Sequence, residues 1–183
     1  MTDRPFIVVS GLPGSGKTTL AVGLARELGL PLLDKDDILE ALFESFETID
    51  LATRQRLSRA SDVVLAKIAA RSPGAVIVSF WRRDGMDGTS GTPTGWLSAL
   101  PQNLLEVHCD CPAALAEARF RARQRHAGHH DGARLAILHE QLQSLAALGP
   151  LKIGPLVTVP TSGPYDLLLV AQEVQRRLDD GRA

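Results

Sequence analysis

The sequence predicts an α/β protein with a parallel β-sheet that has helices on both faces. Short runs of β-branched residues alternate with longer amphipathic runs along the whole chain. This alternation favours parallel strands, because each intervening helix returns the chain to start the next strand in the same direction. The length of 183 residues suits one domain over 1–183 and leaves little room for a second.

Five strands and six helices are expected in order. The run AVIVSF at 75–80 is continuously apolar or β-branched and therefore predicts a buried central strand. The segment 84–95 is rich in Gly and Thr, which predicts a mobile loop. The expected strands are 5–10, 30–34, 75–80, 103–109 and 155–160, and the expected helices are 17–28, 37–46, 50–71, one starting at Pro112, about 132–148, and 165–178.

The first expected strand leads into a glycine-rich turn that reads G-x-x-x-x-G-K-T from Gly11 to Thr18. The glycines permit crowded backbone angles, so successive N–H groups and the start of the next helix can converge on one anion. Lys17 would reach the β- and γ-phosphates of ATP, and the Thr18 hydroxyl would lie on Mg²⁺. A glycine-rich turn without a ligand is the alternative, but the flanking strand and helix favour a phosphate site. The predicted ATP-binding residues are Gly11, Leu12, Pro13, Gly14, Ser15, Gly16, Lys17, Thr18 and Thr19.

Three carboxylates, Asp34, Asp36 and Asp37, directly follow the second expected strand. A right-handed crossover places the carboxyl end of that strand on the phosphate side of the sheet. A carboxylate there can accept the proton of a substrate hydroxyl as its oxygen attacks the γ-phosphate. Asp36 or Asp37 could instead cap the following helix, and both roles can hold at once.

Four arginines alternate at 119, 121, 123 and 125 in a segment expected to be helical. Arg119 and Arg123 would share one helix face, with Arg121 and Arg125 roughly opposite on the solvated surface. The first pair could also be solvated, since basic helices are common. The segment HAGHHD at 126–131 is interpreted as a hinge-like break between two helices, and its histidines lack a fourth metal ligand at a natural spacing.

Trp81 and Arg82 follow the third expected strand on the ligand side, with Arg83 next to them. They could bind an acceptor, or Trp81 could simply close the end of the sheet. Ser79 stands where many P-loop proteins carry an acid near Mg²⁺, which argues against a motor ATPase. The segment TSGP at 161–164 has the composition of an ordinary turn.

The segments GLPGSGKTTLA, LDKDDILEAL, SFWRR, LEVHCDCP and TVPTSGPYD together resemble small P-loop kinases of the AAA-33 type. That group includes predicted kinases near zeta toxin, chloramphenicol phosphotransferase and polynucleotide kinase, and ARFRARQRHAGHHD is similar to the lid of gluconate kinase. The resemblance implies a P-loop NTPase fold with strand order 2-3-1-4-5 and a helical lid at about 115–148. It also implies that Asp36 is the general base, that lid arginines cover the migrating phosphoryl group, and that backbone groups of TSGP at 161–164 hold adenine. The implied catalytic residues are Lys17, Asp36, Arg119 and Arg123, and the implied substrate residues are Asp34, Trp81 and Arg82.

Composition limits the partners. A net charge of -1 gives no global attraction to nucleic acid or anionic membranes. Aromatic residues make up only 4%, so few bases could be stacked, and a nucleic-acid acceptor is disfavoured. No run approaches the roughly 20 apolar residues that cross a bilayer, and the N-terminus has no apolar signal core, so we expect no membrane partner and a cytoplasmic protein. Cys109 and Cys111 are expected to be reduced packing residues.

Two functions remain after this reading. The first is an ATP-dependent phosphotransferase that uses Mg²⁺ to move the γ-phosphate to a hydroxyl of a small molecule. The second is a nucleotide-binding or slow ATPase module that regulates a partner. Asp36 and the arginine pair favour the kinase, and the absence of T-x-x-G and N-K-x-D motifs argues against a GTPase. Neither the acceptor nor the oligomeric state can be read from the sequence.

Overall fold

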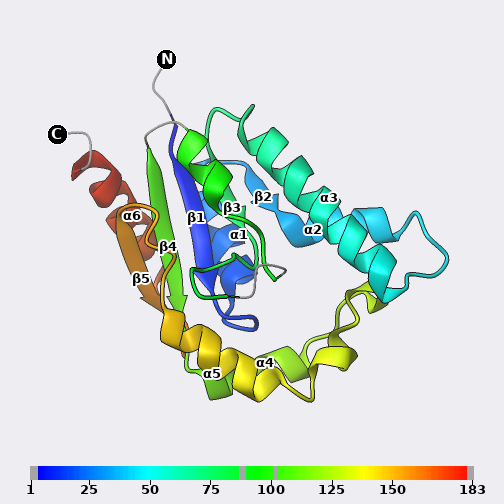
Figure 1. Ribbon diagram of the computed structural model, residues 1–183. Helices are drawn as coiled ribbons and strands as arrows, with labels where there is room; N and C mark the ends of the chain where they lie inside the picture. The colour runs from blue at the N-terminus through cyan, green and yellow to red at the C-terminus, as the bar shows by residue number, and fades with distance from the viewer. Residues whose placement is uncertain (1–3, 87–89, 101–102, 181–183) are drawn as a thin grey trace.

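A five-stranded parallel sheet organises the molecule (Figure 1). The computed structural model describes residues 4–86, 90–100 and 103–180. The strands lie in the order β2-β3-β1-β4-β5 and every neighbouring pair is parallel, which confirms the predicted fold. The strands are β1 (Phe6–Gly11), β2 (Leu32–Asp34), β3 (Ala75–Val78), β4 (Leu104–Asp110) and β5 (Leu156–Pro160). The α-helices are α1 (Lys17–Leu28), α2 (Lys35–Phe43), α3 (Leu51–Ala69), α4 (Ala113–Ala122), α5 (Leu138–Leu148) and α6 (Leu167–Asp180), and the 3₁₀ turns are η1 (Gly95–Ala99), η2 (Ala127–His129) and η3 (Asp131–Arg134).

Helices cover both faces of the sheet. On one face, α1 and α6 pack their apolar residues against alternate residues of β1, β3, β4 and β5. On the other face, α3 and η1 pack against the remaining residues of β1 and β3. All four residues of β3 are buried, as the continuous apolar run predicted. The sheet thereby holds the carboxyl ends of β1, β2 and β3 in fixed positions beside one another.

A third apolar cluster joins the turn after β1 to α4 and α5. Leu12 packs there with Phe120, Leu138 and Leu142. The contact is close, because a Cβ on Gly14 would lie 2.2 Å from the backbone oxygen of Ala116. A movement of α4 would therefore displace the backbone of the glycine-rich turn.

The segment between α4 and α5 differs from the prediction. The helix expected over about 132–148 begins only at Leu138, after the turns η2 and η3. Helix α4 ends at Ala122, and Arg123 has an extended backbone (φ -74°, ψ 144°). The expectation that Arg119 and Arg123 share one helix face is therefore wrong, because ion pairs and packing with α2 and Asp131 hold the chain after Ala122 in an extended path.

Residues 123–137, called the arch segment below, extend from α4 and α5, which lie below the sheet, to the loop between α2 and α3 (Figure 1). The His129 ring lies 2.7 Å from a Glu40 carboxylate oxygen, and the His130 ring lies 2.7 Å from the backbone oxygen of Ile49. A Cβ on Gly128 would lie 2.8 Å from the Phe43 ring. The stretch interpreted as a hinge-like break is thus docked on α2.

The Gly- and Thr-rich loop is held at one end. Thr92 exchanges backbone hydrogen bonds with Phe80 and Arg82, and its hydroxyl lies 2.6 Å from that of Ser79. The predicted mobility of 84–95 therefore does not extend to Thr92, and residues 87–89 lie outside the described part of the chain. Within the described residues, no helix combines the length and the apolar character needed to cross a membrane.

Candidate active site

The glycine-rich turn has the backbone of a phosphate cradle. Gly14 and Gly16 have φ angles of 82° and 89°, which other residues rarely adopt. Gly16 forms the N-cap of α1 without any side chain over the helix end, and no atom lies within 4 Å of where its Cβ would be. No side chain caps the first N–H groups of α1, which leaves them available to a ligand. An anion of phosphate size fits this arrangement of donors.

Lys17 lies inside the turn. Its ammonium group donates a hydrogen bond of 2.7 Å to the backbone oxygen of Leu12. Burial lowers the pKa of Lys17 to about 8, and the nearby charges of Arg83 and Arg123 act in the same direction. A polyphosphate would favour the charged lysine, since its negative charge counteracts the effect of burial.

Thr18 and Asp34 lie beside Lys17 and form a site with hard oxygen ligands. The Thr18 hydroxyl donates to a carboxylate oxygen of Asp34 over 3.3 Å. The other carboxylate oxygen of Asp34 accepts the backbone N–H of Asp36 at 2.8 Å, so Asp34, and not Asp36 or Asp37, caps α2. Burial raises the pKa of Asp34 to about 6, and the neighbouring Asp36 and Asp37 add to the shift. A hydroxyl next to a buried carboxylate is the donor set that suits Mg²⁺ with its shell of waters.

Asp36 lies under the arch segment. Its carboxylate, half exposed, accepts a hydrogen bond from the Arg125 guanidinium, whose side chain is only 18% exposed. Arg125 also lies 3.6 Å from Asp131 and 4.0 Å from Glu40. The prediction that Arg125 lies on the solvated surface of a helix is wrong, because α4 ends three residues earlier. A helical wheel could not have found this residue.

The two arginines predicted to act together lie in different surroundings. Arg119 donates to the backbone oxygen of Thr161 at 2.8 Å, beside the segment 161–164. Arg123 lies over the Phe120 ring at 3.9 Å and pairs with Asp131 at 3.1 Å. Arg123 is close enough to Lys17 to affect its pKa. Arg121, as expected, is exposed and pairs along α4 with Glu117.

The residues after β3 have structural contacts. Trp81 is 1% exposed, and its indole N–H donates to the backbone oxygen of Val9 at 2.8 Å. It closes the end of the sheet and presents no face to an acceptor. Arg82 donates to the backbone oxygens of Ser90 and Gly91. Arg83 is buried and reaches the backbone oxygen of Gly149, a position that no sequence pattern indicated.

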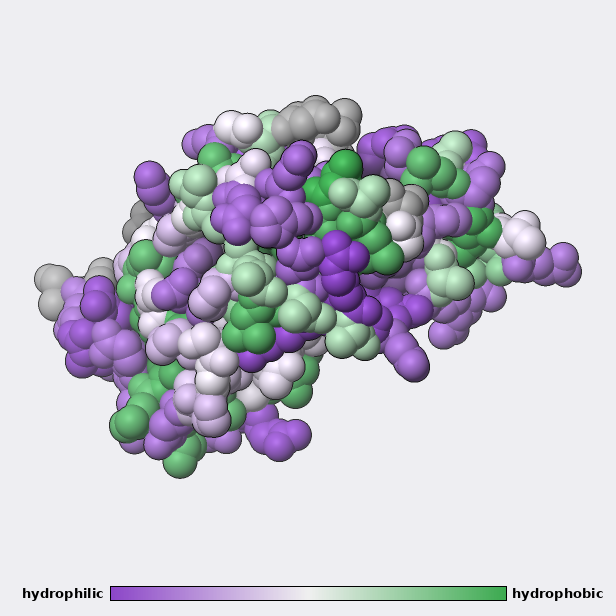
Figure 2. Space-filling model, turned by 90° about the horizontal axis from the view of Figure 1, so that it is seen from below, coloured by the Kyte–Doolittle hydropathy of each residue, from purple (hydrophilic) through white to green (hydrophobic). Residues whose placement is uncertain are grey.

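Two cavities lie on the side of the molecule that carries the glycine-rich turn. A groove of about 500 Å³ runs between α5 and the segment after β3, and its lining includes Phe80, Met86 and Ile137. Figure 2 views the molecule from below and shows hydrophobic residues next to strongly hydrophilic ones on this face. The side of the molecule that carries the glycine-rich turn therefore offers both a cradle for a polyphosphate and room for a second small molecule.

The two cysteines, Cys109 and Cys111, are buried and free, as predicted.

The sequence profile of the AAA_33 family, described as an AAA domain, matches residues 6–148. The chain belongs to this family. The match covers the glycine-rich turn, the carboxylates after β2, the arch segment and α5, while Gly149 and Thr161 lie beyond it. The AAA_33 chain also shares its fold with solved kinases.

A protein from Chloroflexus aurantiacus J-10-fl that is assigned as a kinase superposes with a TM-score of 0.75 and 26% identity, over 96% of this chain and 99% of that one. A gluconokinase from Sinorhizobium meliloti 1021 superposes with a TM-score of 0.55 and 20% identity, over 98% and 94% of the two chains, and shows the fold alone. A shikimate kinase from Thermobifida fusca (strain YX) is 37% identical over 78 residues, 42% of this chain. This chain thus spans only 45% of the length of that relative.

Proposed function

We propose that the AAA_33 chain is an ATP-dependent phosphotransferase that moves the γ-phosphate to a hydroxyl group of a small molecule. One observation carries the proposal. A chain of contacts joins the cradle to the arch segment: Thr18 donates to Asp34, and Asp34 accepts the backbone N–H of Asp36. The Asp36 carboxylate pairs with Arg125 of the arch segment, which lies 3.6 Å from Asp131, the ion-pair partner of Arg123. A phosphate-binding turn, a candidate base and candidate lid cations are therefore linked to one another. A nucleotide-binding module needs only the first of these groups.

The residues divide into roles around the transferred group. The turn from Gly11 to Thr19 binds the polyphosphate, and Lys17 neutralises its β- and γ-oxygens. Thr18 and Asp34 would hold Mg²⁺, which neutralises phosphate charge when bound. The contact of Asp34 with Thr18 supports this role better than the substrate contact expected from the sequence. Arg123 would stabilise charge on the migrating phosphoryl group, and Arg119 would lie on the adenine side next to Thr161.

Asp36 would accept the proton of the attacking hydroxyl. In phosphoryl transfer the alcohol becomes acidic only as its bond to phosphorus forms, so the carboxylate chiefly orients the hydroxyl and takes the proton late. Arg125 holds Asp36 from the arch segment. The docked arch segment therefore holds the carboxylate in position, and it would keep water away from the phosphoryl group.

The test compares two neighbouring carboxylates. Asp36→Asn keeps size and hydrogen bonding but removes the base, so it should leave ATP affinity nearly intact and lower transfer by roughly 10²–10⁴-fold. Asp37 is exposed and does not cap α2, so Asp37→Asn should change transfer and stability little. The acceptor is found beforehand by measuring ADP release over pooled hydroxyl metabolites, with mass detection of the phosphorylated product. Normal transfer in Asp36→Asn together with lost transfer in Asp37→Asn would reverse the assignment.

A further inference from the structure

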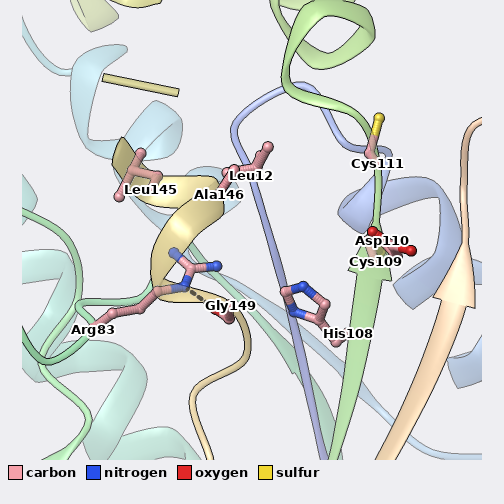
Figure 3. Close-up of a pocket in the computed structure, with 9 residues that line it drawn as sticks. All are labelled: Leu12, Arg83, His108, Cys109, Asp110, Cys111, Leu145, Ala146 and Gly149. Atoms are coloured by element: carbon pink, nitrogen blue, oxygen red, sulfur yellow. Dashed lines mark hydrogen bonds between the residues drawn. The ribbon is translucent and has the colours of Figure 1, made fainter. Parts of the chain in front are cut away.

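A small pocket lies beside the glycine-rich turn, on the side of β4 (Figure 3). Its volume is about 50 Å³. Since one buried water needs about 10–15 Å³ by this measure, the pocket has room for roughly three waters or one small oxyanion group. It is lined by Leu12, Arg83, His108, Cys109, Asp110, Cys111, Leu145, Ala146 and Gly149.

Arg83 is the charged group of this pocket. The residue is 5% exposed, and its Nε–H donates to the backbone oxygen of Gly149 at 2.8 Å. Its Nη1 is buried and has no hydrogen-bond partner. Figure 3 shows the side chain reaching across from the segment after β3 to the end of α5, toward the side where His108 lies. A buried guanidinium with an unpaired nitrogen is costly unless a ligand or water completes it.

No free anion of the pocket satisfies Arg83. Glu106 is buried and its charge acts on Arg83, but its oxygens already accept hydrogen bonds from Ser10 and from the backbone N–H groups of Leu151 and Lys152. Asp110 is exposed, and Figure 3 shows its carboxylate directed away from Arg83. Burial raises the pKa of Cys109 to about 11, so this thiol stays neutral near pH 7.

His108 also lines the pocket. The Ser10 hydroxyl donates its proton to Glu106, so the His108 Nδ1–H donates to the Ser10 oxygen at 2.8 Å. Burial lowers the pKa of His108, and the positive charges of Arg83 and Lys17 act in the same direction. The Nε2 of the neutral ring therefore carries the lone pair and can accept a hydrogen bond from a hydroxyl group of the ligand. The pocket therefore combines one permanent cation, one imidazole and apolar walls from Leu12, Leu145 and Ala146.

We infer that this pocket binds an anionic group, a carboxylate or a phosphate, carried by the acceptor itself. The inference rests on the proposed phosphotransfer. The pocket is lined by Leu12 of the glycine-rich turn, whose backbone oxygen accepts a hydrogen bond from the Lys17 ammonium group at 2.7 Å, so an acceptor held there has its hydroxyl close to the γ-phosphate. The pocket shares Leu145 with the groove of about 500 Å³, which has room for the rest of the acceptor. The acceptor class is a small hydroxy acid or a phosphorylated alcohol, and neutral polyols are excluded.

Binding is tested on the full chain saturated with Mg²⁺ and a non-hydrolysable ATP analogue, so that the glycine-rich turn is occupied. Acetate and methyl phosphate are titrated while the His108 ring is followed by NMR. We expect saturable shifts of the His108 signals, and a loss of affinity of roughly tenfold or more in Arg83→Gln, which keeps a donor for Gly149. Ala146→Met fills the pocket from α5 while it leaves the Arg83 side chain in place, and it should have the same effect. Arg26→Gln, an exposed arginine on α1, is the matched control.

Turnover identifies the acceptor class. Glycerate, glycerol 3-phosphate and glycerol share hydroxyl groups and differ in their anionic group. We expect transfer to one or both of the anionic compounds at roughly 10²-fold or more above glycerol, and a loss of that preference in Arg83→Gln. Equal transfer to glycerol, or unchanged His108 signals in the anion titration, would overturn the inference and leave the kinase proposal standing. Anion binding without transfer to any acceptor would instead overturn the proposed function, and the acceptor assignment with it.

Discussion

The raised pKa of Asp34 makes the binding of Mg²⁺ and nucleotide depend on pH. Burial moves this pKa from its ordinary value of 3.8 to about 6, which corresponds to about 3 kcal/mol at 1.36 kcal/mol for each tenfold change in the proton equilibrium. In the free protein below pH 6 a proton occupies the carboxylate, and Mg²⁺ must displace it. Between pH 7 and pH 5 the affinity for Mg²⁺–nucleotide should fall about tenfold through this residue alone.

Asp34→Asn isolates the effect. Asparagine caps a helix as well as aspartate does, so α2 should be preserved. The phosphates of the nucleotide also take up protons near pH 6, but this contribution is the same for both proteins. Calorimetric titration of each protein with an ATP analogue, with and without Mg²⁺, gives the ratio of their affinities at each pH. The variant should bind the Mg²⁺ complex more weakly at pH 7.5 and should bind the metal-free nucleotide more tightly, because a negative charge is gone.

Stability gives an independent check with the opposite dependence. A folded-state pKa above the unfolded value means that the folded protein holds the proton more tightly. Asp34 therefore contributes stability that is fully present below pH 3.8 and is lost as the pH rises through about 6. This component should disappear in Asp34→Asn when urea unfolding is followed from pH 4.5 to 7.5. If the wild type and the variant show parallel pH profiles both in binding and in unfolding, Asp34 is neither buried as an acid nor a metal ligand.

Three further predictions concern the cradle and the arch segment. Lys17→Ala should abolish most turnover with the fold intact, and full activity of this variant would refute the assignment of the glycine-rich turn as a phosphate cradle. Because the pKa of Lys17 is about 8, the nucleotide affinity of the wild type should fall above pH 8. Gly128→Ala forces a Cβ to 2.8 Å from the Phe43 ring and should increase hydrogen exchange at 126–130, while unchanged exchange would show that the arch segment is not docked there. Arg125→Gln removes the ion-pair partner of Asp36 and should lower transfer roughly tenfold with little change in ATP affinity; a fall in ATP affinity alone would place Arg125 on the nucleotide. In the wild type, bound nucleotide should protect residues 119–134 from hydrogen exchange.

The sheet and the cradle could be predicted because they depend on local patterns. Continuous apolar runs such as 75–78 are typical of strands in a parallel sheet that is covered on both faces. The spacing from Gly11 to Thr18 fixes its own backbone, so the left-handed angles of Gly14 and Gly16 follow from the sequence. The strand order came from the resemblance, and the structure confirms it.

The arch segment could not be predicted in the same way. The arginine run after Pro112 has good helix propensity, and nothing local marks the end of α4 at Ala122. That end is set by partners far along the chain, since Arg125 pairs with Asp36 and His129 with Glu40, each 89 residues away. The buried position of Arg83 likewise depends on Gly149, which a helical or strand period does not reveal.

The central claim is that the γ-phosphate goes to an alcohol and not to water. ATP labelled in its terminal phosphate, incubated with Mg²⁺, the protein and pooled small hydroxyl compounds, allows both fates to be measured in one reaction. The account predicts that most of the label released from ATP appears in an organic phosphate, and that Asp36→Asn loses this product while it still binds ATP. Label found only in inorganic phosphate, with the same rate in the wild type and in Asp36→Asn, would contradict it and would identify a slow ATPase module.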